Sequence, residues 1–358
     1  MREGWEYKKL GDFISEYSVK NRCNEIIPVY SVTNSQGFCK DYFSKEVASQ
    51  DKSTYKIVPY GCFAYNPSRI NVGSVDWQNK EERVIVSPLY NVFSVSENLN
   101  QDFLLYFLKS NGTMGIINTL ATGTVRLNLK LSMLKEFSII VPPLSDQQSI
   151  VEELNTINEL IRLKKEQLKD YDNLVQSIFY EMFGDPVVNE KGWEVKKFAD
   201  LYKLKSGDSL SAKNFVEGEI PVYGGNGISG YHNDFNMDGD FIIIGRVGVY
   251  CGNVREVHGK FWLTDNAFQL FYSRAIQSPC FIHYLLEILD LHKYANAAAQ
   301  PVISNLTLKD VEIIIPPLSL QQLFAKRIEL IEQQKAEIQT TIADLETLLA
   351  SRMQYWFD

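Results

Sequence analysis

The chain has 358 residues, of which 45% are hydrophobic and 22% charged, a composition typical of globular proteins with two or three domains. Its net charge of −8 excludes a uniformly basic nucleic-acid-binding surface. It has no long apolar run, no signal region and no metal-ligand spacing among its five cysteines, which predicts a cytoplasmic protein without a membrane segment or a metal site.

Residues 5–143 are predicted to form a mostly β region with one helix. Short apolar or aromatic runs alternate there with turn signals, for example at residues 34–37 and 66–68. We expect the helix at Asp102–Lys109, followed by a turn at Asn111-Gly112. The expected strands are residues 26–30, 55–58, 62–65, 83–86 and 90–95.

A long helical pattern follows the first β-rich region. Its apolar positions advance by alternating steps of four and three, which is the signature of a coiled coil. These positions are Ile150, Leu154, Ile157, Ile161, Lys164, Leu168, Tyr171, Val175 and Ile178. The single lysine in this series is the one polar interruption of an otherwise apolar or aromatic stripe.

A second region then repeats the order of the first. We expect strands at 241–245, 247–251 and 268–272 and a helix at 280–291. The chain ends in another long helical pattern, whose stripe lies 174 positions after the first one. Its members are Phe324, Ile328, Ile331, Lys335, Ile338, Ile342, Leu345, Leu349 and Arg352.

The repetition is explicit in the sequence. The segment Gly4–Asp12 returns as Gly192–Asp200, an offset of 188 residues. The segment Ile139–Gln148, which contains a Pro-Pro-Leu box, returns as Ile313–Gln322 at an offset of 174. The framing segments therefore match, whereas the material between them differs in length by 14 residues. This pattern indicates two binding units of one architecture that recognise two different targets.

Each stripe needs a long apolar partner, and the other helix is the one available. Antiparallel pairing is the simplest solution, because the first helix leads into the second β-rich region and the second helix leads out of it. This predicts an α+β fold with a pseudo-two-fold repeat, in which an antiparallel coiled coil separates two mostly β domains. The alternative is that each stripe packs on its own domain. Lys164 and Lys335 either fix the register of the helices or reach the solvent.

The chain has two Gly-Trp segments in register with two Pro-Pro-Leu-x-x-Gln-Gln boxes, and each box leads into a coiled-coil helix. Together these motifs give the chain a resemblance to a known family over its whole length. It resembles the specificity subunit of type I restriction-modification systems. The resemblance implies four parts: target recognition domains at 1–143 and 185–316, a central helix at 144–184 and a C-terminal helix at 317–358.

The same resemblance implies the partners. These are double-stranded DNA with a bipartite target, modification subunits that bind S-adenosylmethionine, and restriction subunits that carry an ATP-driven motor. Adenine methylation and cleavage would be carried out by those partners, so the resemblance implies no cofactor for this chain.

The residues themselves also favour a non-enzymatic chain. The nearest match to an Asn/Asp-Pro-Pro-aromatic methyltransferase motif, at 66–69, lacks the second proline and the aromatic residue. The glycines at 245–248 open no helix, and no phosphate-binding glycine-rich loop is present. The four histidines lack metal-ligand spacing. The alternative function is a non-catalytic coiled-coil scaffold or decoy whose two inserts bind protein; a stand-alone enzyme is a more distant one.

Polar loops that follow predicted strands supply the candidates for DNA contact, because Arg reads guanine and Asn or Gln reads adenine. The candidates in the first region are Tyr30, Ser31, Thr33, Asn34, Asn66, Ser68, Arg69, Asn71 and Arg126. Those in the second region are Tyr223, Asn226, Arg246, Asn266 and Gln300. The alternative is that Asn and Gly only build tight turns here, and that the loops carrying Arg126 and Gln300 pack the domains.

The charge is unevenly distributed. Residues 1–143 carry a net charge of +2 and residues 192–316 one of −3, whereas the helical segments 144–191 and 317–358 carry −5 and −2. Neutralisation of phosphates by Lys and Arg dominates the affinity of proteins for nucleic acids. We therefore expect the chain to bind DNA weakly by itself and partner subunits to supply much of the positive surface.

Overall fold

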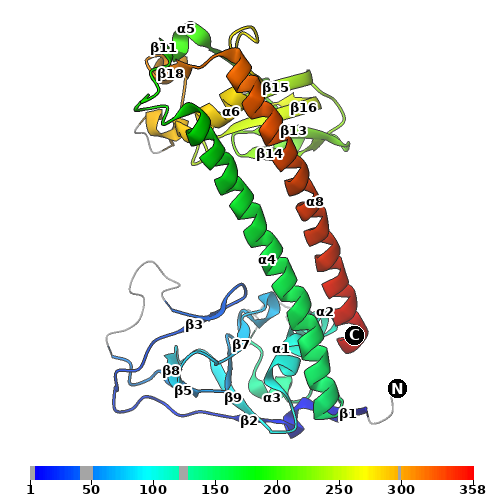
Figure 1. Ribbon diagram of the computed structural model, residues 1–358. Helices are drawn as coiled ribbons and strands as arrows, with labels where there is room; N and C mark the ends of the chain where they lie inside the picture. The colour runs from blue at the N-terminus through cyan, green and yellow to red at the C-terminus, as the bar shows by residue number, and fades with distance from the viewer. Residues whose placement is uncertain (1–4, 41–50, 121–127, 297–299) are drawn as a thin grey trace. The chain divides into compact units, whose positions relative to one another are not determined.

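The computed structural model describes residues 5–40, 51–120, 128–296 and 300–358 (Figure 1). The chain divides into two compact units: unit 1 comprises residues 1–164 and 341–358, and unit 2 comprises residues 165–340. Helices α4 (Leu144–Phe183) and α8 (Leu318–Phe357) each contribute a part to both units. Within the described ranges, no helix combines the length and the apolarity needed to cross a membrane.

Unit 1 is built mainly from short strands. These are β1 (Glu6–Lys9), β2 (Ile14–Glu16), β3 (Ser31–Thr33), β4 (Gly37–Cys39), β5 (Lys56–Pro59), β6 (Phe63–Tyr65), β7 (Val75–Trp77), β8 (Arg83–Val86), β9 (Asn91–Val95) and β10 (Ser138–Val141). Its short helices are α1 (Gln101–Lys109), α2 (Asn111–Leu120), α3 (Leu131–Leu134) and the 3-10 turns η1 (Leu10–Asp12) and η2 (Ile70–Val72). One sheet has the order β2-β9-β6-β7, and β1–β10, β3–β4 and β5–β8 form separate antiparallel pairs.

The core of unit 1 joins this sheet to the helices. Phe63 and Phe93 stack at 5.0 Å between ring centroids, and both are fully buried. Helix α1 begins where the Asn100 side chain accepts a hydrogen bond from the Phe103 amide (3.0 Å), a typical N-cap. Phe103 then packs against Phe357 near the end of α8, at 5.1 Å between centroids. The last turn of the chain therefore completes the core of unit 1.

Unit 2 is built around a six-stranded sheet of order β12-β17-β15-β16-β13-β14. The strands are β11 (Glu194–Lys197), β12 (Lys203–Ser206), β13 (Ile220–Gly224), β14 (Gly227–His232), β15 (Met237–Gly245), β16 (Val254–Leu263), β17 (Ala267–Phe271) and β18 (Glu312–Ile315). The helices are α5 (Phe198–Leu201), α6 (Pro279–Ile288), α7 (Asn305–Leu308) and the 3-10 turns η3 (Ala212–Asn214) and η4 (Leu291–Tyr294).

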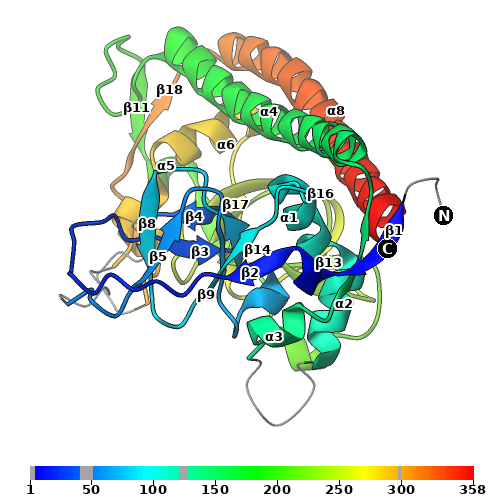
Figure 2. The ribbon, with the colours of Figure 1, turned by 90° about the horizontal axis from the view of Figure 1, so that it is seen from below.

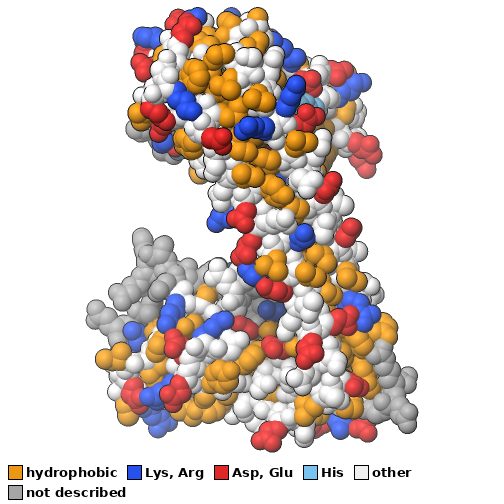
Figure 3. Space-filling model, in the orientation of Figure 1, with side chains coloured by type: hydrophobic (Ala, Val, Ile, Leu, Met, Phe, Trp, Pro, Cys, Tyr) orange, Lys and Arg blue, Asp and Glu red, His pale blue; other side chains and the backbone are white. Residues whose placement is uncertain are grey.

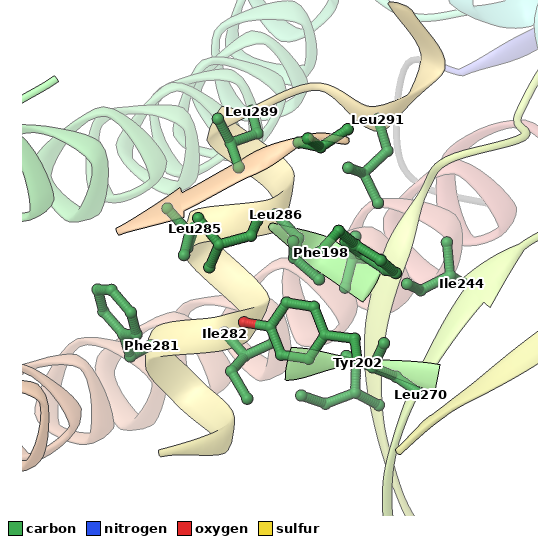
Figure 4. Close-up of a cluster of buried hydrophobic side chains, with 14 of the residues drawn as sticks. Phe198, Tyr202, Ile244, Leu270, Phe281, Ile282, Leu285, Leu286, Leu289 and Leu291 are labelled. Atoms are coloured by element: carbon green, nitrogen blue, oxygen red, sulfur yellow. The ribbon is translucent and has the colours of Figure 1, made fainter. Parts of the chain in front are cut away.

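The main core of unit 2 lies between this sheet and α6. Figure 4 shows Ile282 and Leu286 of α6 facing Tyr202 and Phe198, and all four side chains are buried. The hydroxyl of Tyr202 donates a hydrogen bond to Gln277 Oε1 (2.6 Å), which satisfies a polar group that burial would otherwise leave unpaired.

The sequence repeat corresponds to a repeated frame. β1 pairs with β10 so that Lys9 lies opposite Ser138, and β11 pairs with β18 so that Lys197 lies opposite Glu312. Ion pairs recur at equivalent positions: Lys9 with Glu136 (3.3 Å) and Lys197 with Asp310 (2.7 Å). Each β-rich region is therefore closed by its own antiparallel pair of strands, and the two pairs are equivalent, as the repeat predicts.

The first glutamine of each Pro-Pro-Leu-x-x-Gln-Gln box explains why the box is repeated. Gln147 is fully buried; its side-chain oxygen accepts from the Asn100 amide (2.8 Å) and its amide donates to Asn98 O (3.1 Å) and Pro142 O (2.9 Å). Gln321 makes the same three bonds in unit 2, to Ser278 N, Ile276 O and Pro316 O. Each glutamine thus ties a long helix to the N-terminus of the short helix beside it.

We expect Gln147→Leu to lower the free energy of unfolding of the chain by about 2–4 kcal/mol, because three backbone groups lose their partner and stay buried. Urea unfolding followed by circular dichroism measures the change. Gln148→Leu is the matched control, since Gln148 is the adjacent, exposed glutamine of the same box and its loss should cost about 0.5 kcal/mol or less. Equal effects of the two substitutions would contradict this role.

The long helices pair antiparallel within each unit. In unit 1 the start of α4 lies beside the end of α8 (Figures 1 and 2), where Arg352 Nη2 donates to Glu153 Oε2 (3.1 Å) and Trp356 Nε1 donates to the same oxygen (3.2 Å). In unit 2 the later part of α4 meets the start of α8, where Lys335 Nζ lies 2.8 Å from Asp172 Oδ1. The predicted antiparallel pairing is confirmed.

The buried members of the stripes are Ile150, Leu154, Ile157, Ile161 and Val175 on α4, and Phe324, Ile328, Ile331, Ile338 and Ile342 on α8. Buried members of the predicted stripes also take part in the cores of the units, as the alternative expects: Ile150 and Leu154 belong to the core of unit 1, and Val175, Phe324, Ile328 and Ile331 belong to that of unit 2. Lys335 interrupts the stripe without facing open solvent, because its side chain is only 18% exposed. It is held by Asp172 of the other helix and by Glu332 of its own, each at 2.8 Å.

Two expected strands are wrong. The run 26–30 is not a strand, since Ile26 is exposed and Pro28 has no N–H with which to continue a ladder. The run 247–251 forms a turn, in which Gly248 adopts a φ of +85°, a left-handed conformation that strands do not use.

The expected turn at Asn111-Gly112 is also wrong, because these residues begin helix α2. Ser110 Oγ accepts a hydrogen bond from Thr113 N (3.3 Å), so a serine cap starts a new helix where the glycine indicated a turn. The helix expected at Asp102–Lys109 agrees with α1 to within one residue.

Candidate nucleic-acid interface

Five of the residues predicted to contact DNA line one small hollow in unit 1. Its volume is about 100 Å³. The five come from two separate stretches of the sequence and are Ser31, Thr33, Asn34, Asn66 and Arg69. Val32, Val72, Ser74 and Tyr90 complete the lining. The hollow presents hydroxyl, amide and guanidinium groups, the chemistry that reads base edges and phosphates.

The β3–β4 hairpin forms one wall of the hollow. Thr33 Oγ1 accepts a hydrogen bond from Gln36 N (3.0 Å), which closes the turn after β3. Behind the turn, Asp76 Oδ2 accepts from Phe38 N (2.9 Å). Gly37 lies between them with a φ of +60°, and a Cβ at this position would stand 1.8 Å from the Asp76 carboxylate. Only glycine lets the hairpin approach Asp76 this closely.

The loop after β6 forms the opposite wall. Asn66 Oδ1 accepts from Ser68 N (3.0 Å), so its side-chain carbonyl builds the turn, while its side chain also bonds that of Tyr90. Ser68 and Arg69 are exposed, and Asn71 is half-buried in the following 3-10 turn. Among the residues that the structure describes, Arg69 forms no ion pair, which leaves its guanidinium for an external ligand.

Tyr30 is not among the residues that line the hollow. Tyr30 is 7% exposed, and its hydroxyl donates to Glu81 Oε1 (3.3 Å), so it anchors the start of the hairpin inside the unit. Arg126 lies outside the described residues. Leu129, which is described, donates from its amide to Pro67 O (3.1 Å) beside the Asn66–Arg69 loop.

In unit 2, backbone hydrogen bonds join the loops that carry the candidates. The Thr264 amide donates to Tyr223 O (2.9 Å), and the Arg246 amide donates to Asn266 O (2.9 Å). The chain that follows Gln300 joins the same group, because the Gly248 amide donates to Pro301 O (2.9 Å). Asn226, Asn266 and Gln300 are exposed at their positions in these loops.

Arg246 is partly committed inside unit 2. Its Nη1 donates to Ser206 Oγ and to Asp265 O, each at 3.2 Å, and its guanidinium lies 5.6 Å from the centroid of the Phe268 ring. The side chain is half-buried. These contacts hold the loops around residues 246 and 265 together, so a positioning role accounts for Arg246 at least as well as contact with DNA.

A much larger groove, about 1300 Å³ in volume, lies within unit 2, and Tyr223 and Asn226 are among its lining residues. Arg255 and Lys335 also line it, together with carboxylates from α4, β16, α6 and α8: Asp172, Glu256, Glu287, Glu329 and Glu332. Burial raises the pKa of Glu256 and that of Glu287, and burial lowers the pKa of His283 to about 4, so this histidine is neutral at pH 7. Sequence reasoning missed the groove, because no motif marks residues that only the fold brings together.

The surface carries a mixture of positive and negative side chains, as the distribution of charged residues in the sequence indicates. On the face of each unit that Figure 3 shows, Lys and Arg side chains are interspersed with Asp and Glu side chains. No continuous basic patch appears on that face. Among the described residues, no group of His, Cys, Asp and Glu has the arrangement of a metal site.

Comparison with known proteins gives one consistent result. The family model for the type I restriction modification DNA specificity domain matches residues 2–170 and again residues 190–347. The specificity subunit of the Escherichia coli type I restriction enzyme EcoprrI is 30% identical over 151 residues, which are 40% of this chain and 37% of that protein. This chain therefore spans little more than a third of that relative's length.

Solved structures share the fold. The S subunit of the type I restriction-modification system of M. genitalium aligns over 99% of this chain and 96% of its own, with a TM-score of 0.57 and 16% identity. A chain from a study of complex assembly and conformational transition of the type I R-M system aligns over 99% and 98%, with a TM-score of 0.62 and 17% identity.

Proposed function

The chain belongs to the family of type I restriction-modification DNA specificity proteins, and from this premise we propose that it is a non-catalytic specificity subunit that reads a bipartite DNA target. Unit 1 would read one half of the target and unit 2 the other. The observation that carries this proposal is a repeated frame, made of β1–β10 and β11–β18, around two loop clusters of different sequence. The recognition domains would be residues 1–143 and 185–316.

The chemistry of the loops supports base reading. Unit 1 offers Arg69, Asn34 and Asn66 around one hollow, and unit 2 offers Tyr223 and Asn226 in the lining of its groove. The guanidinium group of arginine can donate two hydrogen bonds to guanine, and the carboxamide group of Asn or Gln can form two hydrogen bonds with adenine. Short side chains such as Ser31 and Thr33 suit phosphate contacts that position the protein on the duplex.

We also propose modification subunits and restriction subunits as partners that supply methylation and cleavage. Large apolar side chains remain exposed on both long helices, namely Leu160, Leu163 and Leu174 on α4 and Leu330 and Leu348 on α8. Leucines exposed on a coiled coil favour the docking of further helices. The negative charge of the chain supports the same view, because partners must then supply part of the phosphate-binding surface.

The test is binding to duplexes from a randomised library, with the chain alone and in complex with a modification subunit. We expect sequence-selective, salt-dependent binding by the complex and much weaker binding by the chain alone. Capture of proteins without any sequence-selective DNA binding by the complex would favour the alternative, a coiled-coil scaffold or decoy. Tight, specific binding by the chain alone at physiological salt would contradict the role given to the partners.

Arg69→Ala should weaken recognition of one half-site by about 1–3 kcal/mol, because a guanidinium that reads guanine loses both hydrogen bonds at once. Binding of the complex to duplexes mutated in one half-site or the other measures it. Arg83→Ala is the matched control in the same unit, since Arg83 pairs with Glu25 (2.8 Å) and does not line the hollow. If Arg69→Ala and Arg83→Ala bind every duplex alike, Arg69 is only part of a turn.

A further inference from the structure

Arg255, which the sequence did not single out, lies against the hairpin turn that carries Asn226. It sits near the start of β16 and is half-buried on the wall of the unit 2 groove. Its Nη2 lies 3.5 Å from the carbonyl oxygen of Asn226. A Cβ on Gly227, whose φ is +97°, would stand 3.2 Å from the Arg255 Cζ. The guanidinium therefore occupies the space that the missing side chain of Gly227 leaves open.

The guanidinium of Arg255 makes no close ion pair inside the described part of unit 2, although its charge acts at a distance on Glu287, whose pKa is raised by burial and lowered in part by this charge. No ion pair of Arg255 exists in the part of the chain that the structure describes, although Glu256 and Glu287 line the same groove. Within the described ranges its side chain makes one hydrogen bond, to Asn226 O, and this bond is long. Arg246 differs, because one of its terminal nitrogens already donates to Ser206 and Asp265. Arg255 thus has the more available guanidinium of the two.

The geometry limits how this guanidinium can act. Contact with the backbone of the turn restricts its orientation, which favours the planar, two-bond contact that arginine makes with guanine. Tyr223 and Asn226 line the same groove, so an aromatic ring and a carboxamide are available beside it. The surrounding carboxylates disfavour phosphate there, because like charges repel. The site is therefore better suited to discriminating between bases than to general attraction of DNA.

We propose that Arg255 is a specificity-determining residue of unit 2 that reads a guanine in the half-site recognised by that unit. This inference rests on the proposed function of the chain. Gly227 is the positioning residue that lets the guanidinium lie against the turn.

The experiment uses the full chain in complex with a modification subunit and duplexes with each base pair of both half-sites varied. Arg255→Lys keeps the charge and removes the fork, so discrimination at one base pair of the unit 2 half-site should fall about ten- to a hundredfold. Discrimination within the other half-site and the salt dependence should not change. Gly227→Ala should cause the same selective loss, with thermal unfolding used to verify that the chain folds.

Arg274→Lys is the matched control, because Arg274 is exposed in unit 2, makes an equally long contact (Nη2 to Asp240 O, 3.5 Å) and does not line the groove. It should leave all preferences unchanged. Uniform weakening on every duplex by Arg255→Lys, or no change at all, would overturn the proposal. Absence of any sequence preference in the complex of the unsubstituted chain would instead refute the proposed function, so the two failures are distinguishable.

Discussion

Exchanging residues 13–134 for the corresponding segment of another family member should replace one half of the recognised DNA sequence and leave the other half unchanged. The segment contains the whole described hollow of unit 1, including Asn34 and Arg69. It leaves in place β1, β10 and Gln147, whose partners at residues 98 and 100 are backbone groups that any donor sequence supplies. Sequencing of methylated sites in cells that express the hybrid measures the result.

The donor segment should keep an aromatic residue at the position of Phe103, because Phe357 packs against that ring in the core of unit 1. The reciprocal exchange, of residues 202–308 inside the frame of β11 and β18, should change only the other half-site. A change in both halves after either exchange would show that the two units do not read independently. Loss of all methylation by a hybrid that still assembles with its partner would contradict the model equally.

The repeated parts of the fold could be predicted from the sequence because their signals are local and periodic. Apolar residues at alternating intervals of four and three positions predict the stripes that contain Leu154 and Ile328, and both residues are buried as expected. The Pro-Pro boxes mark the frame, but their role follows from the contact of Gln147 with the N-terminus of α1. That contact joins residues 47 positions apart, which no local pattern records.

The availability of individual side chains in the loops could not be predicted either, because it too depends on contacts between residues far apart in the sequence. The sequence pattern makes Arg246 a candidate because it follows an apolar strand, yet its guanidinium is engaged by Ser206, 40 positions earlier. Arg255 is not marked by any local pattern, because its contact with the turn at Asn226 joins residues 29 positions apart. Polar loops could be predicted as candidate reading surfaces, but the side chains available to a ligand are determined by tertiary contacts.

The long helices lead to the second prediction of large effect, a change in the spacer of the target. We expect that adding four residues between Lys164 and Lys165, and four between Thr340 and Thr341, lengthens the spacer by one or two base pairs. These are the points where the chain passes from one unit to the other, so the contacts inside each unit remain intact. Four residues add about one helical turn, roughly 6 Å, and B-DNA rises about 3.4 Å per base pair. The half-site sequences should not change, because neither loop cluster is altered.

An insertion of two residues at the same points is the control. It would rotate the following part of each helix by roughly 200° and turn the neighbours of Ile161 and Ile338 toward water. This variant should lose solubility or assembly and should not shift the spacer. Sequencing of methylated sites and size-exclusion chromatography of the complex compare the two insertion variants. If the four-residue variant assembles and methylates at the original spacing, α4 and α8 do not set the distance between the half-sites, and the spacing must be set by the partner subunits.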